Sequence, residues 1–239
     1  FPCLCYKTSI AVYDDFIPQS RLKKICKAFM KAFIPYAVII FMMLPVCLLI
    51  NLFGSTDPGQ IFTSFISLLF YGACLISLCL FINELIPNSI AAFTVSAIIL
   101  AVFNSIHNIT LYVNTPAFIT AICKELSFAW HFDAASKGIF DTRDILWLLL
   151  WSAFFLFAAY FTIEFRRGFK PNKKQNLFFS LILYIFILSL AISDNLFTRL
   201  DFSKNKSYSV NAYTKNIVQD LDDTLNITYY RSGSLSKLY

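Results

Sequence analysis

Residues 61–82 read IFTSFISLLFYGACLISLCLFI, a run that contains no charged side chain and no proline. A bilayer core about 30 Å thick is crossed by about 20 helical residues, so the run is long enough to cross lipid once as a helix. Lipid offers the backbone no hydrogen-bond partners, which favours a helix over an isolated strand. The run therefore predicts a membrane-spanning helix from Ile61 to Ile82.

The whole chain has the same character. Of its 239 residues, 58% are apolar and 14% are charged, whereas soluble domains are about 45–50% apolar and about 25% charged. This composition excludes an ordinary soluble domain and favours a multi-pass membrane protein. The first residue is Phe, which favours reading the sequence as part of a longer chain.

Further apolar runs predict more helices of membrane length. They are Ala32–Phe53, Ser89–Val113, Ile145–Phe165 and Leu177–Ile192. Prolines such as Pro35 and Pro45 in the first of them are tolerated in membrane helices. The predicted fold class is an all-α polytopic membrane protein with about five transmembrane helices and a partial α/β C-terminal domain.

The charges between the runs predict the orientation, because cytoplasmic loops collect Lys and Arg. Residues 1–31 carry six bases against two acids, and the link 166–176 carries five bases. Residues 54–60 carry no base, and 105–144 carry three bases against four acids. We therefore expect the N-terminus and the 166–176 linker in the cytoplasm, with 54–60, 105–144 and everything after residue 193 outside. This alternation fits five crossings of the membrane.

The tail, residues 193–239, is polar and predicts the start of an extracytoplasmic domain that is truncated here. Thr198–Phe202 reads as a short strand and Val210–Leu221 as a helix with Ser209 as its N-cap. Leu225–Tyr230 alternates like a second strand.

A basic amphipathic helix is predicted just before the first span. In Gln19–Ala32 the apolar residues recur at helical spacing, and the bases lie between them. Such a helix fits two roles, binding of lipid head groups or docking onto a cytoplasmic partner. The pattern leaves both open.

The stretch before the Ile145 span carries three charges. Asp141 can cap that helix, with Asp144 reaching back in a capping box and Arg143 pairing with either acid. A structural role is the first reading, and contact with a passing substrate is the second. Nearby Leu126–Phe132 reads as an interfacial segment, and His131 with Asp133 is too small a set of ligands for a metal site.

The chain carries no recognisable catalytic motif. It has no phosphate-binding loop, no nucleophile elbow and no HExxH pair, and its seven cysteines show no CxxC pair. Ionisable residues are almost absent from the predicted spans, which disfavours an ion-driven carrier. We therefore expect no enzyme activity, no bound cofactor or metal and no nucleic-acid partner, and any energy for transport would come from another subunit.

Three stretches resemble a known family. Asp57-Pro-Gly-Gln-Ile61, with Ser127–Phe132 and Gly138–Asp144, is similar to the membrane subunit of gliding-motility-associated type-2 ABC exporters. The similarity covers about residues 8–167. It implies that 32–165 holds the last four of the family's six permease helices, and that 105–144 forms an outer gate.

The resemblance also implies functional residues. Pro18-Gln-Ser20 and Lys27 fall near the family's cytoplasmic proline-x-serine and lysine. The implied ATPase-coupling residues are Pro18, Ser20, Arg21, Lys23, Lys24 and Lys27. The implied residues of the outer gate are Asp57, Gly59, His131, Asp141, Arg143 and Asp144.

The tail resembles a second protein of the same system. Arg199–Ser203, Lys206–Ser209, Thr214-Lys215 and Leu221–Thr228 are similar to the start of the auxiliary gliding-type transport protein. Two modules would then be fused, with 177–192 as the anchor of the second and 193–239 able to engage an extracytoplasmic partner.

Together these features predict the permease half of an exporter. Its expected partners are a cytoplasmic ABC ATPase that binds ATP and Mg, a second permease half and the lipid bilayer. The alternatives are a membrane scaffold of a motility or secretion complex that transports nothing, an integral-membrane enzyme, and a decayed reading frame.

Overall fold

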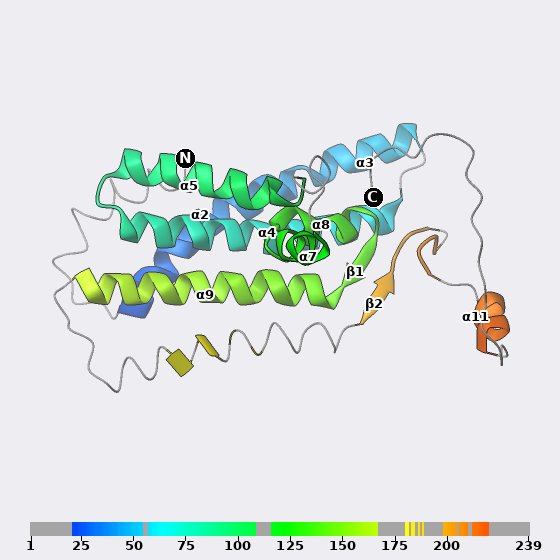
Figure 1. The fold of residues 1–239 in the computed structure, drawn as a ribbon. Coiled ribbons are helices and arrows are strands. Elements are labelled where there is room, and N and C mark those ends of the chain that lie inside the picture. Colours follow the sequence, from blue (N-terminus) through cyan, green and yellow to red (C-terminus); the bar gives the residue numbers. More distant parts are fainter. Residues whose placement is uncertain are drawn as a thin grey trace.

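The computed structural model describes residues 21–54, 57–108, 116–166, 198–204, 206–209 and 212–219, with single positions between 180 and 188. The described part is mostly helical (Figure 1). The expected fifth span, 177–192, lies largely outside the described residues, and its described positions 180, 181, 183, 184, 186 and 188 are helical. The expected strand Leu225–Tyr230 lies outside them altogether.

Among the described residues, four helical stretches are long and apolar enough to cross a membrane. They are Leu22–Cys47, Pro58–Leu85, Ser89–Asn108 and Thr142–Ile163. Each overlaps one of the first four predicted spans, although the first begins ten residues before the predicted Ala32. This supports a membrane protein.

The first predicted span, Ala32–Phe53, is divided in the structure. Helix α2 runs from Arg21 to Met42, and α3 runs from Leu44 to Phe53 after a turn at Met43. Pro45 lies in the first turn of α3, where its missing N–H costs no helical hydrogen bond. The basic segment is part of α2, so no break separates it from the apolar helix.

The next two helices begin at side-chain caps. In α4, Pro58–Leu85, the Asp57 carboxylate accepts from the Gly59 N–H, and Pro58 opens the first turn. In α5, Ser89–Ser105, Asn88 accepts from the Ile90 N–H. A 3₁₀ turn, η1 (Ile106–Asn108), follows α5.

The segment between α5 and the last long helix is folded. It contains α7 (Ala117–Glu125), α8 (Phe128–Ser136) and the short strand β1 (Ile139–Asp141). Ser127 caps α8 by accepting from the Trp130 N–H. Helix α9 (Thr142–Arg166) then begins directly after β1.

Helix α4 is the centre of the bundle, in contact with α2, α5, α8 and α9. Small residues on α4 allow close approach: the Ser152 hydroxyl of α9 donates to the Ala73 carbonyl (3.5 Å), and the Tyr36 ring of α2 lies against Gly72. The buried core consists of Cys74, Leu78, Ile82, Phe128, Trp147, Leu148 and Phe155. The outward faces of α2, α3 and α5 remain apolar and exposed, as expected for surfaces in lipid.

Strand β1 pairs with a strand from the tail. Strand β2, Arg199–Asp201, runs antiparallel to it, with Ile139 opposite Asp201 and Asp141 opposite Arg199. The predicted strand Thr198–Phe202 is therefore present, but its partner lies in the segment between α5 and α9. The predicted helix is present as α11, Ala212–Gln219. The hydroxyl of Ser209, the predicted N-cap of this helix, donates to the Lys206 carbonyl, and residues 210 and 211 lie outside the described residues.

The bundle has two distinct ends. We call the end that carries the start of α4, α7, α8, β1, β2 and the start of α9 the cap end, and the opposite end, with the start of α2 and the end of α9, the basic end (Figure 1). The segments predicted to lie outside gather at the cap end. Residues 21–31, predicted to be cytoplasmic, lie at the basic end.

Candidate functional site

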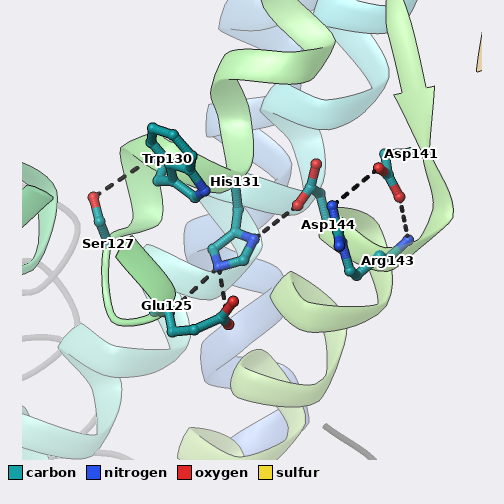
Figure 2. A network of polar contacts seen from close by, with 7 residues as sticks. All are labelled: Glu125, Ser127, Trp130, His131, Asp141, Arg143 and Asp144. Atoms are coloured by element: carbon teal, nitrogen blue, oxygen red, sulfur yellow. Dashed lines mark hydrogen bonds and ion pairs between the residues drawn. The ribbon is translucent and has the colours of Figure 1, made fainter. Parts of the chain in front are cut away.

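A network of polar side chains lies at the cap end, where α7, α8 and α9 meet (Figure 2). Its centre is His131, which is buried with 4% of its side chain exposed. Its Nδ1 lies 2.8 Å from Asp144 Oδ1, and its Nε2 lies 3.3 Å from the Glu125 carbonyl oxygen and 3.8 Å from Glu125 Oε2. One imidazole thus joins three helices.

The surroundings of His131 determine what it can do chemically. Both ring nitrogens face acceptor oxygens; a neutral ring donates to one side only, whereas an imidazolium donates to both. The ring also stacks on Trp147, with centroids 4.0 Å apart and planes at 20°. The arrangement is suited to holding the three helices together.

Asp141 and Arg143 form the entrance to α9. The buried Asp141 carboxylate accepts from the Arg143 N–H at 3.0 Å and pairs with the Arg143 guanidinium at 3.5 Å. This confirms Asp141 as a cap and Arg143 as its partner. The expected reach of Asp144 back to the cap is wrong, because the Asp144 carboxylate is bound to His131. The main chain of Asp141 belongs to β1 instead.

The second part of the cap end is built around the start of α4. We call residues 198–204 and 206–209 the strap, because they cross from β1 to α4. Asp57 Oδ1 accepts from the Gly59 N–H (2.9 Å), and its Oδ2 accepts from the Lys204 N–H (2.7 Å). The Phe202 ring lies near Phe62 of α4 and Phe140 of β1. Asp57 therefore caps α4 and holds the strap.

Hydrogen bonds tune the acidity of two aspartates in this region. The Lys204 N–H holds the pKa of Asp57 below its ordinary value, and the Gly59 N–H acts in the same direction. The Ser203 hydroxyl, with the N–H groups of Ser203 and Tyr208, lowers the pKa of Asp201. Both carboxylates are thus ionised at neutral pH and act as acceptors only.

The predicted gate residues separate into these two groups. His131, Asp141, Arg143 and Asp144 lie together around the start of α9, whereas Asp57 and Gly59 lie at the start of α4. The strap connects the groups, since it pairs with β1 and binds Asp57. Asp133, considered with His131 as a metal pair, bonds instead with Lys137. In the part of the chain that the structure describes, no three His, Cys, Asp or Glu side chains could hold a metal ion.

The predicted coupling residues are at the opposite end. Lys23 and Lys27 are exposed in the first turns of α2, and Lys24 is half-buried. Arg21 begins the helix, while Pro18 and Ser20 lie outside the described residues.

Several residues of the cap end were not found by sequence reasoning. Glu125 and Trp147 complete the surroundings of His131, and Phe202 and Lys204 anchor the strap. Glu125 and His131 are six residues apart, on either side of the Ser127 cap, and this spacing does not indicate from the sequence that the two are in contact. Asp144 and Trp147 three residues apart on one helix face would have been the most usable clue.

Comparison with known proteins gives little further guidance. No family model and no solved structure matches the chain. An uncharacterized protein of Borreliella burgdorferi is 37% identical over 70 residues, which are 29% of this chain and 14% of that protein. The match thus spans about a seventh of the relative's length and does not show a family.

Proposed function

We propose that this chain is the membrane-spanning subunit of an ATP-driven exporter in a bacterial cytoplasmic membrane, with a separate ATPase bound at the basic end. The N-terminus would be cytoplasmic and the cap end extracytoplasmic. The observation that carries the proposal is the continuity of α2, which runs from exposed lysines into an apolar helix without interruption.

Continuity matters because it gives a partner mechanical access to the bundle. The first turns of α2 expose Lys23 and Lys27, while Ile25 and Ala28 are buried against the protein. Further along, the same helix contacts α4 and α9. A partner that pulls on the basic surface would move a membrane helix directly, since backbone hydrogen bonds transmit displacement along a helix. Pro35 lies inside α2 and removes one of these bonds, but the residues on both sides of it belong to the same helix.

The packing of α2 leaves room for such a movement. A groove of about 470 Å³ lies between α2, α4 and α9, with Phe29 and Phe33 on one wall and Leu149 and Leu156 on another. Tight interiors hold few voids larger than a water molecule. Helix α2 is therefore less firmly held than α9, which packs closely against α4.

The cap end supports the outer gate of the proposal. His131 ties α7, α8 and α9, and the strap ties β1 to the start of α4. A gate must be closed by contacts that can be broken and reformed, and hydrogen bonds between separate elements meet this requirement. Chemistry is not required of any of these residues.

The test is copurification of this chain with the separate ATPase that the proposal requires. The double variant K23E/K27E should lose the ATPase, because the two reversed charges face the docking surface. The matched control, K206E/K215E, reverses two exposed lysines of the tail and should retain the ATPase.

Equal retention by both variants would refute docking at the basic end. A second outcome would also count against the proposal: no ATPase copurifies with the unaltered chain, and added nucleotide does not alter the composition of the complex that the chain forms. The alternative of a non-transporting scaffold would then replace it.

A further inference from the structure

Helix α7 presents an unusual surface for a segment at the end of a bundle. Phe118, Ile119 and Ile122 are 73%, 41% and 43% exposed, respectively, and fall on one side of the helix. The opposite side, with Thr120 and Cys123, is half-buried. In water such a face would be costly, at about 25 cal/mol for each Å² of apolar surface left exposed.

The orientation of α7 differs from that of the long helices. Helices α4, α5 and α9 run across the view in Figure 1, while α7 is seen nearly end-on next to α8. If the long helices cross the bilayer, α7 lies parallel to its plane. An amphipathic helix in this position buries its apolar face about 5–10 Å into the boundary of head groups and acyl chains.

The depth of α7 follows from its neighbours. Polar side chains lie at the end of α5 and in η1: Asn104 accepts from the Tyr71 hydroxyl (2.7 Å), and His107 bonds to Ser127 (2.7 Å). Tyr71 lies midway along α4, so α5 ends beside the middle of that span. Helix α7 contacts η1 and therefore lies within the length that α4 would span, at the depth of the acyl chains if α4 crosses the bilayer.

The outward side of α5 is apolar and exposed as well. Ile98 and Val102 of α5 are 63% and 53% exposed and lie on the outward side of that span. At the end of α7, Lys124 Nζ lies 4.6 Å from the centre of the Trp130 ring, and Trp130 is itself partly exposed. Tryptophan and lysine together are typical of the interface between lipid and water.

We propose that α7 is an interfacial helix, with Phe118, Ile119 and Ile122 inserted among the phospholipid acyl chains of the leaflet at the cap end. This lipid-binding surface is independent of transport. It has one structural consequence: Glu125, the last residue of α7, accepts from His131, so the lipid-bound helix is attached to the network at the start of α9.

The experiment uses the whole chain in vesicles of phosphatidylcholine and phosphatidylglycerol. The photoreactive residue p-benzoylphenylalanine replaces Phe118 in one variant and Ile122 in a second, and adducts are identified by mass spectrometry after irradiation. Tyr213 of α11 is the matched control, because its exposure, 73%, equals that of Phe118.

We expect phospholipid adducts at positions 118 and 122 and no such adduct at position 213. Two positions are used so that one misfolded variant does not decide the result. The proposal is overturned if both positions crosslink to a second copy of the chain, if neither yields a lipid adduct, or if position 213 yields as much as they do.

Discussion

The carbonyl oxygen of Phe202 lies where any residue larger than glycine at position 59 would place its side chain: a Cβ there would be 1.7 Å from that oxygen. The obstacle is backbone, which cannot rotate away as a side chain can. Glycine at the second residue of α4 is therefore what allows the strap to lie on the helix. The position of the strap therefore depends both on the missing side chain of Gly59 and on the bond to Asp57.

Replacing Gly59 should release the strap. In G59A the new methyl group displaces Phe202, so trypsin should cleave after Arg199 and Lys204 faster than in the unaltered chain. G54A is the control, because a Cβ at Gly54 has its nearest neighbour at an ordinary 3.7 Å. Unchanged cleavage of G59A would mean that the strap does not rest on α4.

Asp57 has two functions that one substitution can separate. In D57N the remaining oxygen still accepts from the Gly59 N–H, as asparagine is an equally good cap. The new amide nitrogen cannot accept from the Lys204 N–H. We expect faster hydrogen exchange in the strap and unchanged exchange in the first turns of α4, measured by mass spectrometry. Equal acceleration in both segments would contradict this division.

The response of the strap to pH follows from the lowered pKa of Asp57 and Asp201. A carboxyl group whose pKa is lower in the folded state stabilises that state above its unfolded pKa, and the contribution is lost as pH falls through the folded value. The ordinary value of these groups is 3.8. Hydrogen exchange of the strap, corrected for its intrinsic dependence on pH, should thus show constant protection from pH 7 to about pH 5 and loss of protection only below the ordinary aspartate range. D57N should weaken this acid-dependent loss of protection, since it removes one of the two titrating carboxyl groups. A loss of protection near neutral pH would contradict the assignment of the effect to Asp57 and Asp201.

The bond between His131 and Asp144 should be energetically coupled. Removing either partner leaves a poorly exposed polar group without its bond, which costs about 1–3 kcal/mol. A double-mutant cycle of H131A and D144A, followed by unfolding in detergent micelles, should give a coupling energy in this range. The control cycle is K137A with D133A, an exposed pair four residues apart on one helix, for which about 0.3–0.5 kcal/mol is expected. Similar couplings in the two cycles would argue against a special role for His131.

The sequence predicted the elements whose cause is local. An uncharged apolar run is enough to define α4, and Asp141 was identified as a cap because its acceptor role depends only on the next two residues. The division of the first span at Met43 was missed, although Pro45 was noticed, because membrane helices often continue through proline.

Contacts between distant segments could not be predicted in the same way. The pairing of β1 with β2 joins three-residue strands separated by the whole of α9, and three residues are too few for an alternating pattern to specify a partner. The pairing of His131 with Asp133 was considered because the two are close in sequence. Residues two apart on a helix do not face each other, and Asp144 reaches His131 from another element.

The proposed orientation can be tested by cysteine labelling in intact cells. In a background with all seven native cysteines replaced by Ala, including the exposed Cys26, a membrane-impermeant maleimide should label K137C in intact cells and K23C only after permeabilisation. Both lysines are exposed and lie at opposite ends of the bundle. Labelling of K23C alone in intact cells would reverse the orientation, whereas labelling of both would contradict a sealed crossing between them.

The contact between α2 and α4 requires glycine at position 72, and the free-energy cost of replacing it can be measured. A Cβ at Gly72 would lie 2.1 Å from the Tyr36 ring, and the Tyr36 hydroxyl is held by a 2.6 Å hydrogen bond to the Leu68 carbonyl. The Tyr36 ring therefore cannot move away from Gly72 without breaking the hydrogen bond of its hydroxyl group. G72A should therefore destabilise the protein by about 1–3 kcal/mol, the usual cost of overpacking, when unfolding is followed in detergent micelles. The same substitution should cost little in a Y36A background, where the space is open, and G54A should be neutral in both. A cost of G72A that persists without the Tyr36 ring would place its origin elsewhere in α4.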